Sequence, residues 1–232
     1  MMPLPPFTAA IFDMDGLLID SERATLRAWT EAALALGVVL RESDYLQVVG
    51  KAAQDSHAIL QRHLGGVAPF EQAMAAVRAA LEEGEGRELL FPLKPGAAAL
   101  LAQLQAAGVP CAVASSSRTD EIAQRLARVG VLPHFAAVAG GNEVLRGKPD
   151  PALYALAAAR LGVDPARCLA FEDSHNGACA ALAAGMGLVV VPDLLQPAPE
   201  VAQACVAVLG SLQEALPRVP QWFASTVPRD SR

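Results

Sequence analysis

Cysteine is scarce in this chain of 232 residues, and long hydrophobic runs are absent. The four cysteines form no C-x-x-C pair, so we expect the reduced, buried thiols of a cytosolic protein at Cys111, Cys168, Cys179 and Cys205. No window approaches the about 18 uninterrupted apolar residues of a membrane span. The first ten residues also lack the basic and apolar regions of a signal peptide. The sequence therefore predicts a soluble cytoplasmic protein with no membrane partner.

The chain also has few positive charges: it contains 18 lysines and arginines and 24 aspartates and glutamates, which gives a net charge of −6. A surface that binds nucleic acid is normally basic, so this balance argues against a nucleic-acid partner. Hydrophobic residues make up 53% of the chain, which is enough to bury a substantial core and excludes intrinsic disorder. The length suits one large domain, or a core domain with a smaller insertion, and we expect a monomer.

Short apolar runs recur along the chain, and helical patterns separate several of them. The runs are FTAAIFD, VPCAVASS, FAAVAG, RCLAFED, GLVVVPD and, more weakly, ACVAVLG. Strands that alternate with helices of this length indicate an α/β protein with a parallel sheet covered on both faces. Apolar runs without alternation fit strands that are buried on both sides.

The interval 23–88 contains helical patterns and no predicted strand. It reads as an all-helical insertion directly after the first strand, large enough to form a lid that excludes water and reads substrate shape. We therefore predict a catalytic core at 1–22 and 89–220, a helical cap at 23–88 and a C-terminal tail at 221–232.

Two aspartates one residue apart, Asp13 and Asp15, lie in the otherwise apolar stretch AAIFDMDGLLID. A buried carboxylate is costly unless it is paired, hydrogen-bonded or bound to a metal. Residues i and i+2 of an extended strand point to the same side, so the two side chains are expected to converge. Two anions held that close require a cation. The alternative interpretation is that they cap the following helix.

Polar residues also end three of the other predicted strands. They are Ser115, Ser116 and Ser117 after the second strand, Lys148 after the third, and Glu172 and Asp173 after the fourth. In an open α/β sheet, ligands bind outside the carboxyl ends of the strands. Carboxylates, hydroxyl groups and one lysine are therefore expected to meet at one edge of the sheet.

This set of side chains suits a phosphate monoester bound together with Mg²⁺. Magnesium prefers oxygen ligands and keeps several waters, so it binds one or two carboxylates plus a substrate phosphate. Asp13 and Asp173 are the expected carboxylate ligands, and the backbone carbonyl group of Asp15 is a third. Glu172 either binds the metal as well or orders the site.

Phosphate itself is predicted to bind Ser115 and Ser116 through their hydroxyl groups and Lys148 through its compact charge. The serine run also suits the N-cap of the next helix, and such a helix end attracts phosphate. A serine hydrolase is not indicated, because no G-x-S-x-G motif surrounds these serines.

The two aspartates receive different chemical roles in this interpretation. Asp13 attacks phosphorus as the nucleophile, which divides hydrolysis into formation and breakdown of an aspartyl-phosphate. Asp15 protonates the departing alkoxide and later takes a proton from the attacking water. General acid–base catalysis of this kind is worth ~10²–10⁴-fold in rate.

The stretches DMDGLLIDSE, VASSS, GKPDP and FEDSHNG together resemble the four motifs of the haloacid dehalogenase superfamily of phosphohydrolases. The resemblance covers nearly the whole chain. It implies a Rossmann-like core, a helical cap inserted after the first strand, and magnesium-dependent phosphoryl transfer through an aspartate. A lone D-x-D pair would be weak support, whereas four motifs in order, each at a strand end, are strong support.

Within this superfamily the chain looks most like the β-phosphoglucomutase-like group, which includes the mutase and many sugar-phosphate phosphatases. Thr25 stands where the mutase carries a histidine that assists proton transfer, and Ala53 where it carries a cap arginine. These departures favour a phosphatase for a small phosphorylated metabolite such as a sugar phosphate. A β-phosphoglucomutase-type phosphoryl transferase is the alternative. A non-catalytic module that binds a phosphometabolite is less favoured, because it would have no use for a proton shuttle.

Overall fold

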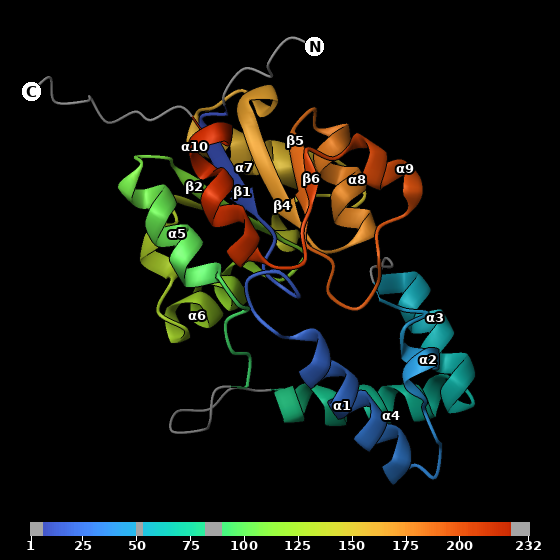
Figure 1. The fold of residues 1–232 in the computed structure, drawn as a ribbon. Coiled ribbons are helices and arrows are strands. Elements are labelled where there is room, and N and C mark those ends of the chain that lie inside the picture. Colours follow the sequence, from blue (N-terminus) through green and yellow to red (C-terminus); the bar gives the residue numbers. More distant parts are fainter. Residues whose placement is uncertain (1–6, 50–52, 82–89, 224–232) are drawn as a thin grey trace, which may run out of the picture. The chain divides into compact units, whose positions relative to one another are not determined.

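The computed structural model describes residues 7–49, 53–81 and 90–223 and divides the chain into two compact units (Figure 1). The first, here called the core unit, comprises the described residues up to Ile19 and from Leu93 onward. The second, the helical unit, runs from Asp20 to Pro92. The predicted insertion at 23–88 lies inside the helical unit.

A six-stranded sheet forms the centre of the core unit, with the strand order β3-β2-β1-β4-β5-β6. All of its strand pairs are parallel. The strands are β1 (Ala9–Phe12), β2 (Cys111–Ser115), β3 (Ala137–Gly140), β4 (Cys168–Glu172), β5 (Gly187–Val190) and β6 (Ala207–Val208). Each lies within one of the six predicted apolar runs, so the predicted α/β fold with a parallel sheet is confirmed.

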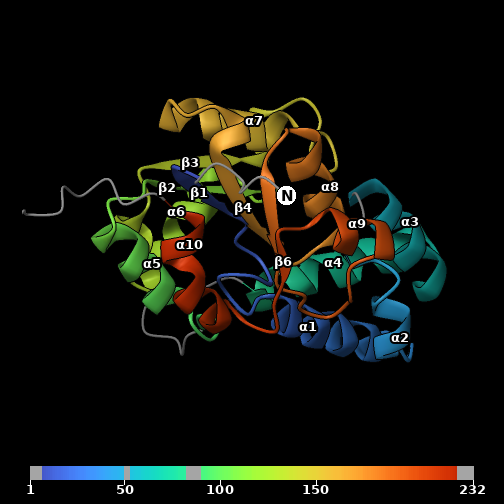
Figure 2. The same ribbon diagram turned by 45° about the horizontal axis from the view of Figure 1, so that its top comes forward.

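Helices cover both faces of this sheet (Figure 2). The α-helices of the core unit are α5 (Ala97–Ala106), α6 (Thr119–Arg128), α7 (Ala152–Leu161), α8 (His175–Ala183), α9 (Pro199–Ala204) and α10 (Val219–Trp222). Short 3-10 helices are η1 (Leu132–His134), η2 (Gly141–Glu143), η3 (Pro165–Arg167) and η4 (Leu212–Arg218). α7 and α8 lie against one face, and α5 and α10 lie over the other (Figures 1 and 2).

The two faces of the sheet are packed differently. Small side chains dominate the face beneath α7 and α8, where Ala112, Ala170 and Ala157 are fully buried in one cluster. Several aromatic rings meet on the other face, where Phe12 stacks on Phe171 with ring centroids 4.7 Å apart. Since both faces are buried, the strands carry no polar alternation, as their apolar runs predicted.

The end of the described chain packs onto the core. Trp222 and Phe223 are buried, and the carbonyl group of Trp222 accepts a 2.8 Å hydrogen bond from the N–H of Phe7. The rings of Phe7 and Phe223 lie 6.4 Å apart. The predicted tail boundary at 220 therefore falls inside α10, because the aromatic side chains beyond it bury apolar area against the core. Residues 224–232 of that tail lie outside the described residues.

The helical unit consists of α1 (Glu22–Ala35), α2 (Glu42–Tyr45), α3 (Ala53–Leu64) and α4 (Val67–Leu81). Its described residues contain no strand. α1 and α4 meet through Trp29 and Phe70, whose stacked rings lie 5.8 Å apart, and His57 of α3 also lies against Phe70 at 5.1 Å. Within the described part of the chain, no helix has the length and apolar character that a membrane crossing requires.

Candidate active site

β1 delivers the first site residue to the edge of the sheet. Asp13 follows Phe12 directly, is 6% exposed, and donates its backbone N–H to the carbonyl group of Phe171 at 3.0 Å. The chain then turns at Gly16, whose φ of +84° is unfavourable for other residues. A Cβ atom on Gly16 would lie 2.3 Å from Oδ2 of Asp173, so glycine also allows this close approach.

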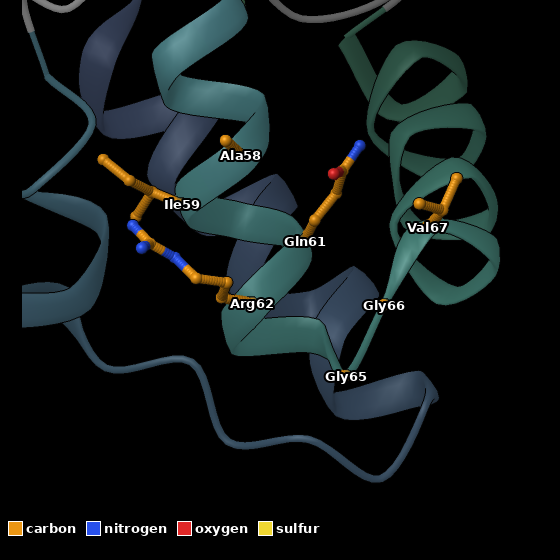
Figure 3. A pocket seen from close by; sticks show the side chains of 7 residues that line it. All are labelled: Ala58, Ile59, Gln61, Arg62, Gly65, Gly66 and Val67. Atoms are coloured by element: carbon orange, nitrogen blue, oxygen red, sulfur yellow. The ribbon is translucent and has the colours of Figure 1, made fainter.

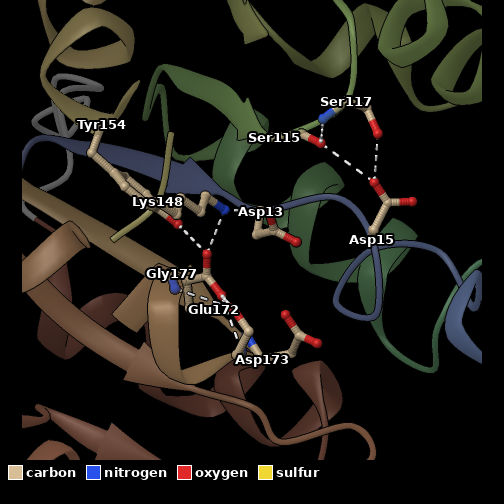
Figure 4. Close-up of polar contacts among 10 residues, drawn as sticks. Asp13, Asp15, Ser115, Ser117, Lys148, Tyr154, Glu172, Asp173 and Gly177 are labelled. Atoms are coloured by element: carbon tan, nitrogen blue, oxygen red, sulfur yellow. Dashed lines mark hydrogen bonds and ion pairs between the residues drawn. The ribbon is translucent and has the colours of Figure 1, made fainter. Parts of the chain in front are cut away.

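Lys148 lies between two carboxylates from neighbouring strands (Figure 4). Its Nζ donates to Oδ1 of Asp13 and, at 2.5 Å, to Oε1 of Glu172. Burial opposes the charged form of this side chain, which is only 7% exposed, but the two carboxylates raise the pKa of Lys148 above its usual value. The lysine therefore carries its positive charge at neutral pH.

Glu172 is fully buried and surrounded by donors. Besides Lys148, it accepts hydrogen bonds from the hydroxyl group of Tyr154 at 2.8 Å, the N–H of Asp173 at 3.0 Å, and both the N–H and the hydroxyl group of Ser174. Although burial opposes ionisation, the Lys148 ammonium holds the pKa of Glu172 below its usual range. These contacts make Glu172 a fixed anion that orients Lys148.

The last residue of β4, Glu172, leaves room only for a glycine at position 177. A Cβ atom on Gly177, in the first turn of α8, would lie 1.7 Å from Oε1 of Glu172. The N–H of Gly177 donates instead to the hydroxyl group of Ser174 at 3.1 Å, which caps the helix. The motif FEDSHNG thus places a carboxylate beneath the start of α8 where only glycine leaves room for it.

Asp13, Glu172 and Asp173 can each offer one carboxylate oxygen such that the three oxygens lie within 4.8 Å of one another. Burial raises the pKa of Asp13 well above its ordinary value, and the nearby Lys148 opposes this rise. A donor set made only of carboxylate oxygens fits magnesium, which prefers such ligands to nitrogen or sulfur. The structure therefore brings together three of the four residues predicted as metal ligands.

The fourth predicted ligand is the backbone carbonyl group of Asp15, and the carboxylate of this residue faces other partners. Its Oδ2 accepts hydrogen bonds from the hydroxyl groups of Ser117 at 3.0 Å and Ser115 at 3.4 Å (Figure 4). Its Oδ1 accepts from Nη1 of Arg125, in α6, at 3.0 Å. Asp15 thus belongs to a second polar group beside the one around Lys148.

The serine loop after β2 differs in detail from the prediction. Ser115 is buried, and its hydroxyl group accepts a 3.1 Å hydrogen bond from the N–H of Ser117. Ser116 is exposed. Among the described residues, no hydrogen bond joins the side chain of Ser116 to the cluster around Asp15. Ser117 contacts Asp15 instead, and the i, i+2 spacing from Ser115 is the signal that could have identified it.

Two further residues had weak or no signals in the sequence. Tyr154 is the one aromatic residue in the apolar helix ALYALAAARL, and that contrast hints at a buried hydroxyl group with a partner. Burial raises the pKa of this hydroxyl group, and the adjacent Glu172 raises it further. Arg125 lies among other charged residues of α6, and nothing in the sequence distinguishes it.

The helical unit contains a separate pocket of about 640 Å³ at the turn between α3 and α4 (Figure 3). It is lined by Ala58, Ile59, Gln61, Arg62, Gly65, Gly66 and Val67. Only one of these side chains is charged, and the lining includes no carboxylate. This pocket therefore does not have the chemistry of the site at the sheet edge.

The sequence matches the family model described as haloacid dehalogenase-like hydrolase over residues 7–185. Hexitol phosphatase A of Escherichia coli K12 is 34% identical over 181 residues, which cover 78% of this chain and 81% of that protein. A phosphorylated carbohydrates phosphatase of Thermotoga maritima is 31% identical over 180 residues, 77% and 82% of the two chains. A solved structure of a HAD family hydrolase from Deinococcus radiodurans R1, with bound phosphate and sodium, is 30% identical with a TM-score of 0.75, covering 94% and 99%.

Proposed function

Because this chain belongs to the haloacid dehalogenase-like hydrolase family, we propose that it is a magnesium-dependent phosphatase that hydrolyses a small phosphorylated metabolite through an aspartyl-phosphate on Asp13. The position of Lys148 between Asp13 and Glu172 is the observation that carries this proposal. A carboxylate that attacks a phosphate dianion is repelled by it, and a buried cation beside both offsets that repulsion.

Asp13 and Asp173 would hold the metal through their carboxylates, and Asp15 through its backbone carbonyl group. When bound, Mg²⁺ supplies positive charge that neutralises the phosphate and stabilises the charge of the transferring phosphoryl group. Glu172, which accepts several hydrogen bonds already, serves the site by holding Lys148 in place.

The reaction requires two displacements at phosphorus. A carboxylate oxygen of Asp13 forms a bond to phosphorus while the bond to the substrate oxygen breaks, and Asp15 gives its proton to that oxygen. In the second displacement Asp15 takes a proton from water, the water oxygen attacks phosphorus, and the bond to Asp13 breaks. Free phosphate leaves and both aspartates return to their starting states.

The phosphate oxygens would be held by the hydroxyl group of Ser115 and the ammonium group of Lys148. Both side chains are buried; Ser115 ends β2, which pairs with β1, and Lys148 lies in the loop between η2 and α7. The exposed hydroxyl group of Ser116 is a further proposed ligand. The adjoining start of α6 adds the favourable field of a helix N-terminus for an anion.

A phosphorylated sugar or sugar alcohol is the proposed substrate class. The relatives that the chain resembles over four fifths of their length are named for hexitol and carbohydrate phosphates. Hydrolysis is favoured over the mutase reaction by Thr25, whose hydroxyl group donates to the carbonyl group of Ser21, the residue before α1, at 2.9 Å. A side chain bonded in this way cannot replace the histidine that assists proton transfer in the mutase.

We propose further that the enzyme is a cytoplasmic monomer whose only partner is its substrate. Its free cysteines fit a reducing compartment, and its net charge of −6 disfavours binding to nucleic acid.

Phosphate release from a panel of phosphometabolites, each with and without Mg²⁺, tests the function. The panel contains hexitol phosphates, hexose 6-phosphates, β-glucose 1-phosphate, phosphoglycolate and nucleoside monophosphates. Magnesium-dependent release that a chelator stops and added Mg²⁺ restores is the expected result. Conversion of β-glucose 1-phosphate to the 6-phosphate without release would show the mutase instead. A folded protein that acts on no compound would support the non-catalytic module.

A further inference from the structure

Three donors hold the carboxylate of Asp15, and all come from β2, the loop after it and α6. The hydroxyl groups of Ser115 and Ser117 donate to Oδ2, and Nη1 of Arg125 donates to Oδ1. The side chains of Asp15 and Arg125 are 26% and 24% exposed, so this ion pair is largely shielded from water. The carboxylate is therefore held in one orientation beside Ser115, the proposed ligand of the phosphate.

The donors differ in what remains available once phosphate is bound. A hydroxyl group has one proton, so Ser115 can donate to Asp15 or to a phosphate oxygen but not to both. Ser117 is not a proposed phosphate ligand and can keep its hydrogen bond to Oδ2 of Asp15. A guanidinium group has five N–H donors arranged in a plane, and Arg125 is not among the proposed phosphate ligands, so its hydrogen bond to Asp15 is kept. Arg125 is thus the contact that holds Oδ1 of Asp15 after phosphate has engaged the hydroxyl group of Ser115.

α6 places Arg125 reproducibly at this position. Ile122 and Leu126, on either side of Arg125 in the helix, are fully buried. These two residues fix one face of α6 in the core. The position of the Arg125 backbone on the adjoining face is therefore fixed as well.

We infer that Arg125 is a positioning residue that holds Asp15 in place for proton transfer to the leaving group, an inference that rests on the proposed phosphatase function. A general acid acts only when its proton lies within hydrogen-bond reach of the leaving oxygen, and small displacements are costly. Without Arg125, phosphate binding to Ser115 would leave Asp15 with the hydroxyl group of Ser117 as its remaining donor among the three described here, and Oδ1 would have none.

Two substrates that differ in their leaving group test the inference. An alkoxide leaves only when it is protonated, whereas p-nitrophenolate is a stable anion that leaves without an acid. The value of kcat/KM reports the first phosphoryl transfer, so it is measured for p-nitrophenyl phosphate and for the alkyl phosphate of the panel that the wild-type enzyme hydrolyses fastest. Proteins with Arg125→Met, Arg125→Lys and, as the matched control on the same helix, Arg128→Met are compared with the wild type.

We expect Arg125→Met to lower kcat/KM about 10- to 100-fold for the alkyl phosphate, as part of the acid–base contribution is lost. For p-nitrophenyl phosphate the decrease should be less than threefold, and the inhibition constant of inorganic phosphate should change little. Arg125→Lys keeps the charge and should restore part of the loss. Arg128→Met should leave the ratio between the two substrates as in the wild type.

Equal losses on both substrates, or no loss on the alkyl phosphate, would overturn the role of Arg125 while the phosphatase function stands. A wild-type protein inactive on both substrates would overturn the proposed function and this inference with it. Melting temperatures of all variants identify any general loss of structure, and Arg125→Lys then carries the comparison because it preserves the pairing charge.

Discussion

The hydroxyl group of Tyr154 donates a 2.8 Å hydrogen bond to Oε1 of Glu172, the same carboxylate oxygen that accepts from Lys148. Tyr154 is fully buried in α7, and its ring also lies beneath the ammonium group, with Nζ 5.1 Å from the ring centroid. A helix on one face of the sheet thereby determines where the charged groups at its edge can lie. The tyrosine couples the packing of the core to the orientation of the site.

Tyr154→Phe should lower the free energy of unfolding by about 1–3 kcal/mol, because a buried carboxylate loses one of its donors. It should reduce kcat by a smaller factor than substitution of Lys148, since the lysine itself remains. Urea unfolding followed by circular dichroism measures the first effect and phosphate release the second. Unchanged stability would show that the hydroxyl group makes no net contribution.

Substitution of each aspartate of the D-x-D pair should impair a different step of the reaction. Asp13→Asn should abolish turnover, because an amide is not a competent nucleophile, and no phosphorylated protein should form. Asp15→Asn should bind phosphate nearly as the wild type does, yet turn over ~10²–10⁴-fold more slowly, since the proton transfer is lost. Rapid quenching with radiolabelled substrate distinguishes the two. Turnover retained by Asp13→Asn would exclude the covalent mechanism.

Gly16→Ala should disrupt metal binding as well as stability. An alanine here has an unfavourable φ and a Cβ atom 2.3 Å from Oδ2 of Asp173, so the carboxylate must move. The matched control is Gly162→Ala at the end of α7, where φ is also positive, at +67°, but nothing lies within 4 Å of the new Cβ atom. Both variants should lose about 1 kcal/mol or more from backbone strain.

Mg²⁺ titrations followed by the rise in melting temperature then separate the two effects. Gly162→Ala should keep the metal-dependent rise, whereas Gly16→Ala should need at least tenfold more Mg²⁺ for the same rise. Equal Mg²⁺ dependence in the two variants would mean that Asp173 does not bind the metal.

The ion pair between Glu143 and Arg160 should make stability depend on pH. Hydrogen bonds from Arg160, from the N–H of Gly140 and from Thr119 lower the pKa of Glu143 to about 2 in the folded state. Since this folded-state pKa lies below that of the unfolded chain, the stabilisation is complete above the unfolded value of about 4.5 and is lost as pH falls toward 2.

Glu143→Gln should therefore be less stable than the wild type at pH 7, and the two urea midpoints should converge as pH approaches 2. Because the pair is partly exposed, the difference at pH 7 should shrink in high salt. If the stability difference between Glu143→Gln and the wild type does not depend on pH, the difference arises from packing and not from charge.

Local patterns were enough to predict which residues meet in much of the candidate site. Asp13, Lys148, Glu172 and Asp173 each follow an apolar run that proved to be a parallel strand or the loop after one, so their meeting at one edge followed from the topology. The expected convergence of Asp13 and Asp15 was only partly right. Asp15 lies close enough to contribute to the raised pKa of Asp13, but its carboxylate faces Arg125 and the serines.

The reason is that the i, i+2 rule holds for extended strands, and β1 ends at Phe12. The chain turns by Gly16, so the backbone at Asp15 no longer continues the strand. Similarly, Ser116 is exposed while Ser115 and Ser117 reach Asp15, because alternate residues of the loop face opposite sides. The sequence shows the i, i+2 spacing of these residues, but it does not show the residue at which each strand ends.

The sequence by itself determined the parallel α/β sheet, the helical insertion, the family and the residues that gather at the sheet edge, because each depends on local periodicity and on motifs at strand ends. Only the tertiary structure decided which charge pairs with which. Lys148 lies between Asp13 and Glu172, and Arg125 faces Asp15 across more than a hundred residues of chain. Such pairings depend on how helices and strands that are distant in sequence pack together, and no local sequence pattern specifies that packing.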